Sequence, residues 1–382
     1  MYIFYIMKIK RQIQQVLESS AFHGKAIVLI GARQVGKTTL FNLLSDSFTQ
    51  KKLFLNCDEP EVKETLTDIN SKNLKLLIAD NKVVVIDEAQ RIPQIGVVLK
   101  RITDNFRDVQ LFVTGSSSFE LQNGLNEPLT GRKLEYHLYP ISTKEIYETS
   151  GLIATKQSLQ SRLIYGSYPD VLNNAENAKE ILLNLSNSYL YRDLLSFEDI
   201  RKPALLEKLL VALALQVGSE VSYNELAQTI GSDTRTVEKY IDLLEKCFVV
   251  FKLNAFNRNV RTELKKGKKV YFWDNGVRNA VLQNFAPLEL RNDAGALWEN
   301  FFISERLKFN EYSRNYCKTY FWRTTIQQEI DFIEEKDGVF SVFEMKWNPK
   351  KGKAKIPETF TRNYTVQQTN IVTPDNYLDF LL

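Results

Sequence analysis

Four short runs of apolar residues alternate with stretches of helical periodicity in the first third of the chain. The runs are rich in Val, Leu and Phe and lack polar alternation, as expected of strands buried on both faces. They read KAIVLIG (25–31), KKLFLNCD (51–58), NKVVVID (81–87) and VQLFVTG (109–115). Strands that alternate with helices favour a parallel sheet covered by helices on both faces. The pattern therefore predicts an α/β domain over residues 1–140, led by a basic helix over residues 8–20.

Helical periodicity continues beyond this domain. Residues 141–202 predict a helical lid or connector, broken at YGSYPD (165–170) because glycine and proline disfavour helix. Residues 203–256 then predict three helices followed by strands, with Ser232 or Asp233 as the cap of the third helix. This order is typical of a winged helix-turn-helix, and the predicted winged-helix domain extends over residues 203–285.

The segment EIDFIEEKDGVFSVFEMKW (329–347) predicts a β-hairpin about its KDG turn, within a last α/β domain over residues 286–382. Its apolar runs carry Asp331, Glu344 and Lys346. In a strand, Glu344 and Lys346 share one face with apolar residues. Burial of two charges is costly unless something compensates them, so the hairpin is either salt-bridged or part of a site.

Composition narrows the class of protein without identifying it. A chain of 382 residues exceeds one ordinary core and indicates two to four domains, and 44% hydrophobic with 25% charged residues is typical of globular proteins. The net charge of +4 neither demands nor excludes nucleic acid. Three scattered cysteines indicate a reducing compartment, and with only two histidines a conventional zinc site is not expected.

The apolar start, MYIFYIM, spans seven residues before Lys8. It is too short for a membrane span or a signal sequence, and no later stretch reaches spanning length. We therefore expect a cytoplasmic protein with no membrane partner. Both Met1 and Met7 are compatible with the start of translation.

Residues 31–38 read GARQVGKT and match the phosphate-binding pattern G-x-x-x-x-G-K-[ST] between a predicted strand and a predicted helix. The glycines let successive N–H groups face phosphate, the lysine neutralises phosphate charge, and the threonine hydroxyl binds Mg²⁺. A glycine-rich turn with a stray lysine is the alternative, which the strand and helix context disfavours. The predicted ATP-binding residues are Gly31, Ala32, Arg33, Gln34, Val35, Gly36, Lys37, Thr38 and Thr39.

Residues 83–90 read VVVIDEAQ, an apolar run that ends in two acids. Asp87, at the predicted strand end, is placed to hold Mg²⁺ together with Thr38. Glu88 is placed to polarise an attacking water, so the pair predicts hydrolysis of ATP. The alternative is a buried strand that ends in two solvated acids.

Polar residues also end the next predicted strand, in LFVTGSSS (111–118). Because the carboxyl ends of parallel strands face the ligand, Thr114 or Ser116 is predicted to contact the γ-phosphate, with an ordinary serine-rich turn as the alternative. In PLTGRKLEYHLYP (128–140), Arg132 is predicted to act as a finger on a neighbouring subunit of a homo-oligomer. A surface or salt-bridged arginine is the alternative.

The order of these motifs resembles one known group of proteins. GARQVGKTT, VVVIDEAQR, LFVTGSSS, LTGR, YPIS, YGSYPDV, YLYRDLL and KVYFWDNGVRNA together are similar to prokaryotic AAA-type ATPases with a C-terminal domain of unknown function. The resemblance covers nearly the whole chain and implies ATP and Mg²⁺ as cofactors of the N-terminal half. It implies a winged helix and a restriction-endonuclease-like fold in the C-terminal half. One departure is YGSYPDV, where the group more often has a second glycine and a glutamate.

A restriction-type nuclease holds Mg²⁺ between two carboxylates and steadies the hydroxide or the scissile phosphate with a lysine. This chain offers Asp331 on one predicted strand, Glu344-Met345-Lys346 on the next, and Glu299 in the preceding helix. Asp331 and Glu344 are the predicted metal ligands, Lys346 the predicted lysine, and Glu299 the assisting acid. The alternatives are a salt-bridged hairpin and a nuclease-like domain that binds nucleic acid without cutting it.

The distribution of charged residues does not identify the binding partner of the C-terminal half. The third helix of the winged-helix pattern carries mixed charge, so packing or protein contact is as good an explanation as DNA binding. Two segments are basic: the wing-like segment 257–270, which includes Lys268 and Lys269, and segment 347–355. They predict phosphate contacts with double-stranded DNA or another nucleic acid. The alternative is that both are solvated loops. We expect an ATPase whose C-terminal half binds nucleic acid, with cleavage left open. An ATP-driven switch for a protein partner and a non-hydrolysing scaffold are the alternatives.

Overall fold

The computed structural model describes residues 9–115, 129–187, 202–257, 267–348 and 356–382. Ser116 and the YLYRDLL motif (189–195) lie outside these residues. Most of the two basic segments, 257–270 and 347–355, lies outside them as well. The chain divides into two compact units. The first is formed by residues 10–140 with 246–248, and the second contains residues 141–245 and 249–382. This division lies at the predicted boundary between residues 140 and 141.

The first unit is a five-stranded, wholly parallel sheet with the strand order β2-β3-β4-β1-β5. Its strands are β1 (Ala26–Ile30), β2 (Lys52–Asn56), β3 (Val83–Asp87), β4 (Gln110–Gly115) and β5 (Lys133–His137). Every residue of β1, β3 and β4 is buried, as the continuous apolar runs predict. The four predicted strands are confirmed, whereas β5 was not predicted.

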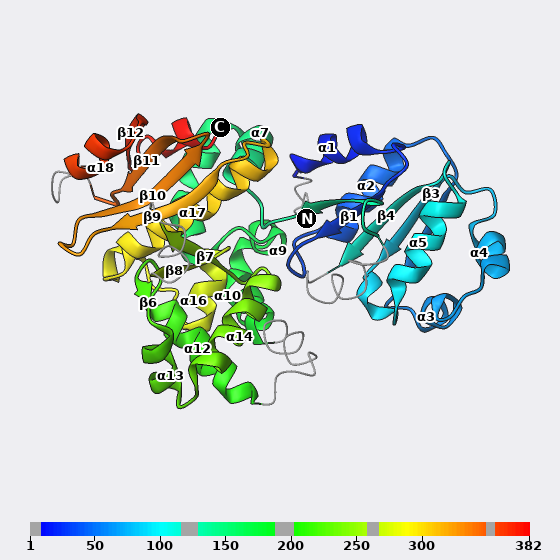
Figure 1. Ribbon diagram of the computed structural model, residues 1–382, viewed down its shortest axis with the longest axis horizontal. Helices are drawn as coiled ribbons and strands as arrows, with labels where there is room; N and C mark the ends of the chain where they lie inside the picture. Colours follow the sequence, from blue (N-terminus) through cyan, green and yellow to red (C-terminus); the bar gives the residue numbers. More distant parts are fainter. Residues whose placement is uncertain (1–8, 116–128, 188–201, 258–266, 349–355) are drawn as a thin grey trace. The chain divides into compact units, whose positions relative to one another are not determined.

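Helices connect these strands and surround the sheet, as the blue to cyan ribbon in Figure 1 shows. They are α1 (Ile13–Ser20), α2 (Lys37–Ser47), α3 (Pro60–Leu66), α4 (Ser71–Ile78) and α5 (Ile95–Asn105), with the short 3₁₀ turn η1 (Ala89–Arg91). Helix α2 packs on β3 and β4. The loop before α2 therefore lies at the carboxyl ends of the central strands, where an α/β sheet places its ligand.

The second unit is built on a seven-stranded mixed sheet with the order β12-β11-β10-β9-β7-β8-β6. The strands are β6 (Glu220–Val221), β7 (Val250–Ala255), β8 (Lys268–Phe272), β9 (Lys318–Arg323), β10 (Glu329–Lys336), β11 (Val339–Met345) and β12 (Val366–Val372). The predicted hairpin is confirmed, because β10 and β11 pair antiparallel around the KDG turn. Figure 1 shows β9 to β12 in orange and red.

Helices of the second unit include those that the periodicity predicts. The helices of this unit are α7 (Thr143–Gln157), α8 (Leu159–Tyr165), α9 (Pro169–Asn173), α10 (Ala178–Leu185), α12 (Pro203–Leu215), α13 (Tyr223–Ile230), α14 (Thr234–Lys246), α16 (Asn275–Val281), α17 (Ala294–Tyr312) and α18 (Glu358–Asn363). Of these, α16 and α18 were not predicted. The 3₁₀ turns in the described part of this unit are η2 (Ala175–Asn177), η4 (Leu288–Leu290) and η5 (Tyr377–Phe380). Asp233 caps α14, because its carboxylate accepts the Thr236 N–H at 2.9 Å. No helix among the described residues is long and apolar enough to cross a membrane.

The structure differs from the predicted organisation at residue 285. Strands β7 and β8 follow α12 to α14, as the winged-helix pattern predicts, but β7 also pairs parallel with β9 through Asn254 with Tyr320 and Ala255 with Phe321. Residues 203–285 and 286–382 therefore share one sheet and one compact unit instead of forming two separate domains.

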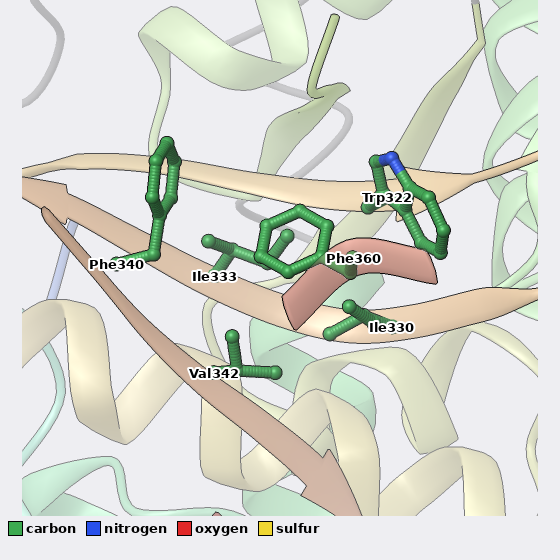
Figure 2. Packing of buried hydrophobic residues seen from close by; sticks show 6 residues of the cluster. All are labelled: Trp322, Ile330, Ile333, Phe340, Val342 and Phe360. Atoms are coloured by element: carbon green, nitrogen blue, oxygen red, sulfur yellow. The ribbon is translucent and has the colours of Figure 1, made fainter. Parts of the chain in front are cut away.

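The hairpin packs one face on an aromatic and aliphatic core. Figure 2 shows six buried side chains of this core, Trp322, Ile330, Ile333, Phe340, Val342 and Phe360, from β9, β10, β11 and α18. Ile330 and Ile333 share this face although they are three apart, because β10 carries one extra residue relative to β9 between them. The bulge falls at Asp331 and so interrupts the strand alternation at a candidate site residue.

The glycine of the YGSYPD segment lies close to a side chain from another part of the second unit. Gly166, at φ 71°, lies so near Asp274 that a Cβ there would be 1.9 Å from the Asp274 Oδ1 atom. The Ser167 N–H donates to the other carboxylate oxygen of Asp274 at 2.7 Å. The glycine is therefore required for packing between this segment and the N-terminus of α16.

Candidate functional sites

The phosphate-binding loop runs from the end of β1 to the start of α2, as predicted. Gly31 lies against the chain at Leu138, whose carbonyl oxygen would be 2.2 Å from a Cβ at position 31. Gly36 has φ 95° and precedes the first residue of α2. The N–H groups at the start of α2 have no partner within the helix and point toward the loop, which makes this place suited to an anion.

Lys37 is buried within this loop. Its ammonium group donates to the carbonyl oxygens of Gly31 at 3.0 Å and Ala32 at 2.9 Å, and the residue is 4% exposed. A lysine held against its own loop needs little reorganisation to exchange a carbonyl for a phosphate oxygen. Thr38 and Thr39 are exposed, whereas Val35 is buried. The residues present thus fit a nucleotide phosphate group.

A chain of hydrogen bonds joins the loop to the ends of β3 and β4. The Thr38 hydroxyl donates to Asp87 Oδ2 at 2.7 Å, and the Thr114 hydroxyl donates to Asp87 Oδ1. The Glu88 N–H donates in turn to Thr114 Oγ at 2.9 Å. A hydroxyl and a carboxylate oxygen are ligands that Mg²⁺ prefers, so Thr38 and Asp87 fit the predicted metal.

Thr114 contacts both acids. It is fully buried, and its hydroxyl both donates to Asp87 and accepts from the Glu88 N–H. Its predicted contact with the γ-phosphate stays a prediction. The strand end in the sequence gives the residue type but not the direction of its side chain, so these partners were not predicted.

Glu88 has a left-handed backbone conformation, with φ 52°. Such a conformation is uncommon for a residue other than glycine and is frequent at functional sites. The side chain is half-buried and accepts a hydrogen bond from Gln90. Burial and the nearby Asp87 and Asp58 raise the pKa of Cys57 to about 12, so this cysteine remains a thiol beside the acids.

Arg11 is a contributor that the sequence analysis missed. It is 5% exposed and donates to the carbonyl oxygens of Val35 at 2.7 Å and Tyr139 at 2.6 Å. One guanidinium group thus links the phosphate-binding loop to the segment that ends the first unit. No motif marks this arginine, because it lies just before α1 in an otherwise ordinary basic stretch.

Arg132 lies on the surface of the first unit. Its Nε atom is 2.6 Å from Asp104 Oδ1, and both side chains are 40% exposed. An exposed ion pair of this kind contributes little to stability. The role as a finger toward another subunit stays a prediction, and the observed pair matches the alternative of a salt-bridged arginine. Arg33 is half-buried and Gln34 is exposed, both within the loop.

The hairpin brings the predicted nuclease residues together. The Met345 N–H donates to Asp331 Oδ2 at 2.9 Å, and the Lys346 ammonium group donates to Glu344 Oε1 at 2.7 Å. Glu344 Oε2 is buried and has no hydrogen-bond partner among the residues that the structure describes. Burial raises the pKa of Asp331, and burial together with Asp331 raises the pKa of Glu344.

Lys269 completes this cluster and corrects a prediction. It was predicted to lie in a basic wing that contacts phosphates, but it lies in β8 and is 2% exposed. Its ammonium group is 2.6 Å from Glu329 Oε1 and 3.2 Å from Glu299 Oε1. The Tyr271 hydroxyl also donates to Glu299 Oε1, at 2.6 Å. Lysine and tyrosine at alternate positions of a strand share one face, which is the sequence signal that was overlooked.

The charged groups of this cluster shift one another's pKa values. Burial, together with the nearby Asp331, raises the pKa of Glu299 to about 7 in spite of Lys269, which lowers it. The described residues contain no group of three or more His, Cys, Asp or Glu side chains that could hold a metal ion. The positive charge that the sequence analysis assigned to Mg²⁺ is thus supplied in part by the chain itself.

Comparison with protein families agrees with the phosphate-binding site. Residues 23–147 match the AAA domain family. The N-terminal unit is therefore similar to AAA-type P-loop domains. Residues 156–288 and 294–378 match two families that are each described as a domain of unknown function, DUF8612 and DUF4143. These matches give the second unit no function, and they do not test its predicted winged helix and nuclease-like fold.

Similar chains occur in bacteria and archaea. An uncharacterized protein of Haemophilus influenzae is 27% identical over 334 residues, which cover 81% of this chain and 79% of that protein. One from Methanocaldococcus jannaschii is 24% identical over 402 residues, covering 96% of this chain and 85% of the relative. Among solved structures, a Walker-type ATPase of Pyrococcus abyssi aligns with a TM-score of 0.47 and 15% identity, over 73% of this chain and 96% of that chain.

Proposed function

We propose that the AAA-type domain binds ATP with Mg²⁺ and hydrolyses it. The observation that supports this proposal is the set of bonds from Thr38 through Asp87 and Thr114 to Glu88, which links the proposed metal ligands and the proposed base to the residues that follow the phosphate loop. A simple nucleotide scaffold needs no such ordered acid pair.

In this proposal each residue has a separate task. The loop N–H groups and Lys37 bind the phosphates, and Lys37 exchanges its bonds to the loop carbonyls for phosphate oxygens. When bound, Mg²⁺ neutralises phosphate charge, and Thr38 and Asp87 would hold it. Glu88 accepts a proton from, or orients, a water molecule aimed at the γ-phosphate. Thr114 keeps both acids in place.

Replacing Lys37 by alanine tests the nucleotide site. Loss of a charge-assisted contact of about 2–3 kcal/mol should weaken ATP binding roughly 30- to 150-fold. Titration calorimetry with ATP and Mg²⁺ measures this change. Lys51→Ala is the matched control, because Lys51 forms an exposed pair with Asp80. Normal ATP affinity in Lys37→Ala would place the nucleotide elsewhere.

For the second unit, the finer hypotheses are nucleic-acid binding with cleavage and, alternatively, a switch that responds to ATP and contacts a protein partner. We favour the switch, and the observation behind this choice is Lys269 among the carboxylates of the nuclease-like cluster. The basic segments that predict phosphate contacts lie mainly outside the described residues, so they do not decide between the two hypotheses.

A plasmid assay separates the two hypotheses. We expect the purified protein to leave supercoiled plasmid intact with Mg²⁺ or Mn²⁺, with and without ATP, because Lys269 already supplies positive charge beside Glu299 and Glu329. Lys346→Ala serves as the control for contaminating nucleases. Cutting by the wild type that disappears in Lys346→Ala would contradict the switch hypothesis and support a nuclease.

A further inference from the structure

The partly buried carboxylate cluster of the second unit carries its own cations. Its carboxylates are Glu299, Glu329, Asp331 and Glu344, and its ammonium groups are Lys269 and Lys346. Carboxylates that approach one another without a cation repel strongly in a partly desolvated site. A site of this composition therefore needs positive charge, either from a bound metal or from the chain.

Lys269 is placed to supply that charge. Its side chain is 2% exposed, it contacts Glu299 and Glu329, and its charge also acts on Asp331. A buried ammonium group is costly to desolvate unless it is well paired. Here the ammonium group has two carboxylate partners within 3.2 Å. Lys269 thus compensates Glu299 and Glu329 without an added ion.

A divalent cation held with the help of Glu299 would compete with this ammonium group for Glu299 Oε1, which Lys269 contacts at 3.2 Å. Asp331 and Glu344 are the predicted metal ligands, and Glu299 is the assisting acid, but Glu299 is already bonded to Lys269 and Tyr271. Lys346 in turn bonds Glu344 at 2.7 Å. A metal ion bound at this point would lie beside a fixed positive charge, and the repulsion would be large in a medium of low dielectric constant.

We propose that Lys269 is a resident cation that takes the place of a divalent metal in this carboxylate cluster, and that removing its charge exposes a latent metal site. The proposal depends on the geometry of the second unit alone and not on ATP turnover. It assigns Lys269 as a positioning and charge-compensating residue. It also identifies the ligand that the vacated cluster would take, a hard divalent cation such as Mn²⁺.

The test compares Mn²⁺ binding to the full chain in the absence of nucleotide. Electron paramagnetic resonance of free Mn²⁺ measures binding to wild type, Lys269→Met, Lys269→Arg and the double variant Lys269→Met/Asp331→Asn. We expect Lys269→Met to bind one additional Mn²⁺ at least tenfold more tightly than wild type. Lys269→Arg retains the charge and should bind no more than wild type. The double variant should lose the additional ion.

Two results would overturn the proposal. One is a wild type that already binds Mn²⁺ in a way that Asp331→Asn abolishes. The other is a folded Lys269→Met that gains no binding. Circular dichroism establishes folding, and Lys269→Gln provides a smaller polar replacement if methionine is not tolerated. If both variants fold only when Mn²⁺ is added, that dependence supports the proposal, whereas failure to fold in Mn²⁺ contradicts it. ATP turnover, measured separately, reports only on the first unit.

Discussion

Glu88→Gln should bind ATP as wild type does and should turn it over about 10²- to 10⁴-fold more slowly. The amide keeps the size of the side chain and a carbonyl oxygen able to accept the hydrogen bond from Gln90. It cannot accept a proton from water. The backbone of Glu88, fixed by its N–H bond to Thr114 at 2.9 Å, should remain in place, so nucleotide affinity should change by less than about threefold.

Phosphate release under saturating ATP measures turnover, and calorimetry measures binding. Glu64→Gln is the matched control, because Glu64 is an exposed acid of α3. Unchanged turnover in Glu88→Gln would remove Glu88 as the base. A wild type with no turnover at all would instead support the non-hydrolysing scaffold, and the contrast between variant and wild type separates these outcomes.

The parallel sheet was predictable because burial on both faces leaves a simple trace in sequence. Strands β1, β3 and β4 are buried at every position and are almost wholly apolar. Strand β5 was missed because it is an edge strand of half-buried residues, in which Lys133, Glu135 and His137 alternate with Leu134 and Tyr136. Polar side chains on an edge hide the strand from a search for apolar runs.

The pairing that joins residues 203–285 and 286–382 in one sheet could not be predicted. The pairing between β7 and β9 rests on two residue pairs that are 66 positions apart, as the numbers 254 and 320 or 255 and 321 show. Neither segment carries a local signal of its partner, because register between distant strands depends on the packing of the whole sheet. A domain boundary at residue 285 was therefore inferred where the structure has a continuous sheet.

The candidate sites also divide into residues that a local sequence pattern predicts and residues that only the fold brings together. The phosphate loop and the acids that follow β3 were found because their chemistry demands fixed spacing within one short segment. Lys269 was misplaced because a run of basic residues is usually solvated, and only the compact fold brings β8 beside α17. Arg11 was missed for a similar reason, since its partners Val35 and Tyr139 are 24 and 128 positions away.

A second buried ion cluster in the C-terminal unit is structural. Glu305 on α17 is 3% exposed and accepts a hydrogen bond from Lys308 at 2.7 Å. Its other oxygen accepts from the Thr143 N–H at the start of α7 and is 3.3 Å from Arg162 on α8. One carboxylate thus joins three helices and compensates two buried cations.

We expect Glu305→Gln to destabilise this unit by about 3–5 kcal/mol, because it leaves Lys308 and Arg162 buried without their counter-charge. Thermal unfolding followed by circular dichroism measures the change, with the transition of the second unit analysed separately. Glu358→Gln is the matched control, because Glu358 forms an exposed pair with Arg362 and its replacement should leave unfolding unchanged. An equal effect of both substitutions would contradict a special role for Glu305.

The same cluster fixes the direction of a pH dependence. Burial raises the pKa of Glu305, but Lys308 and Arg162 lower it more, to about 2, below the 4.5 of a free glutamate. A carboxyl whose pKa is lower in the folded state binds its proton more readily when unfolded, so its stabilisation is present above pH 4.5 and is lost between pH 4.5 and 2. The stability difference between wild type and Glu305→Gln should therefore be constant from pH 7 to about 5 and should shrink by about 3 kcal/mol on acidification to pH 2. Denaturant unfolding at a series of pH values measures it, and a difference that grows in acid would show that the charge on Glu305 is not what stabilises the folded unit.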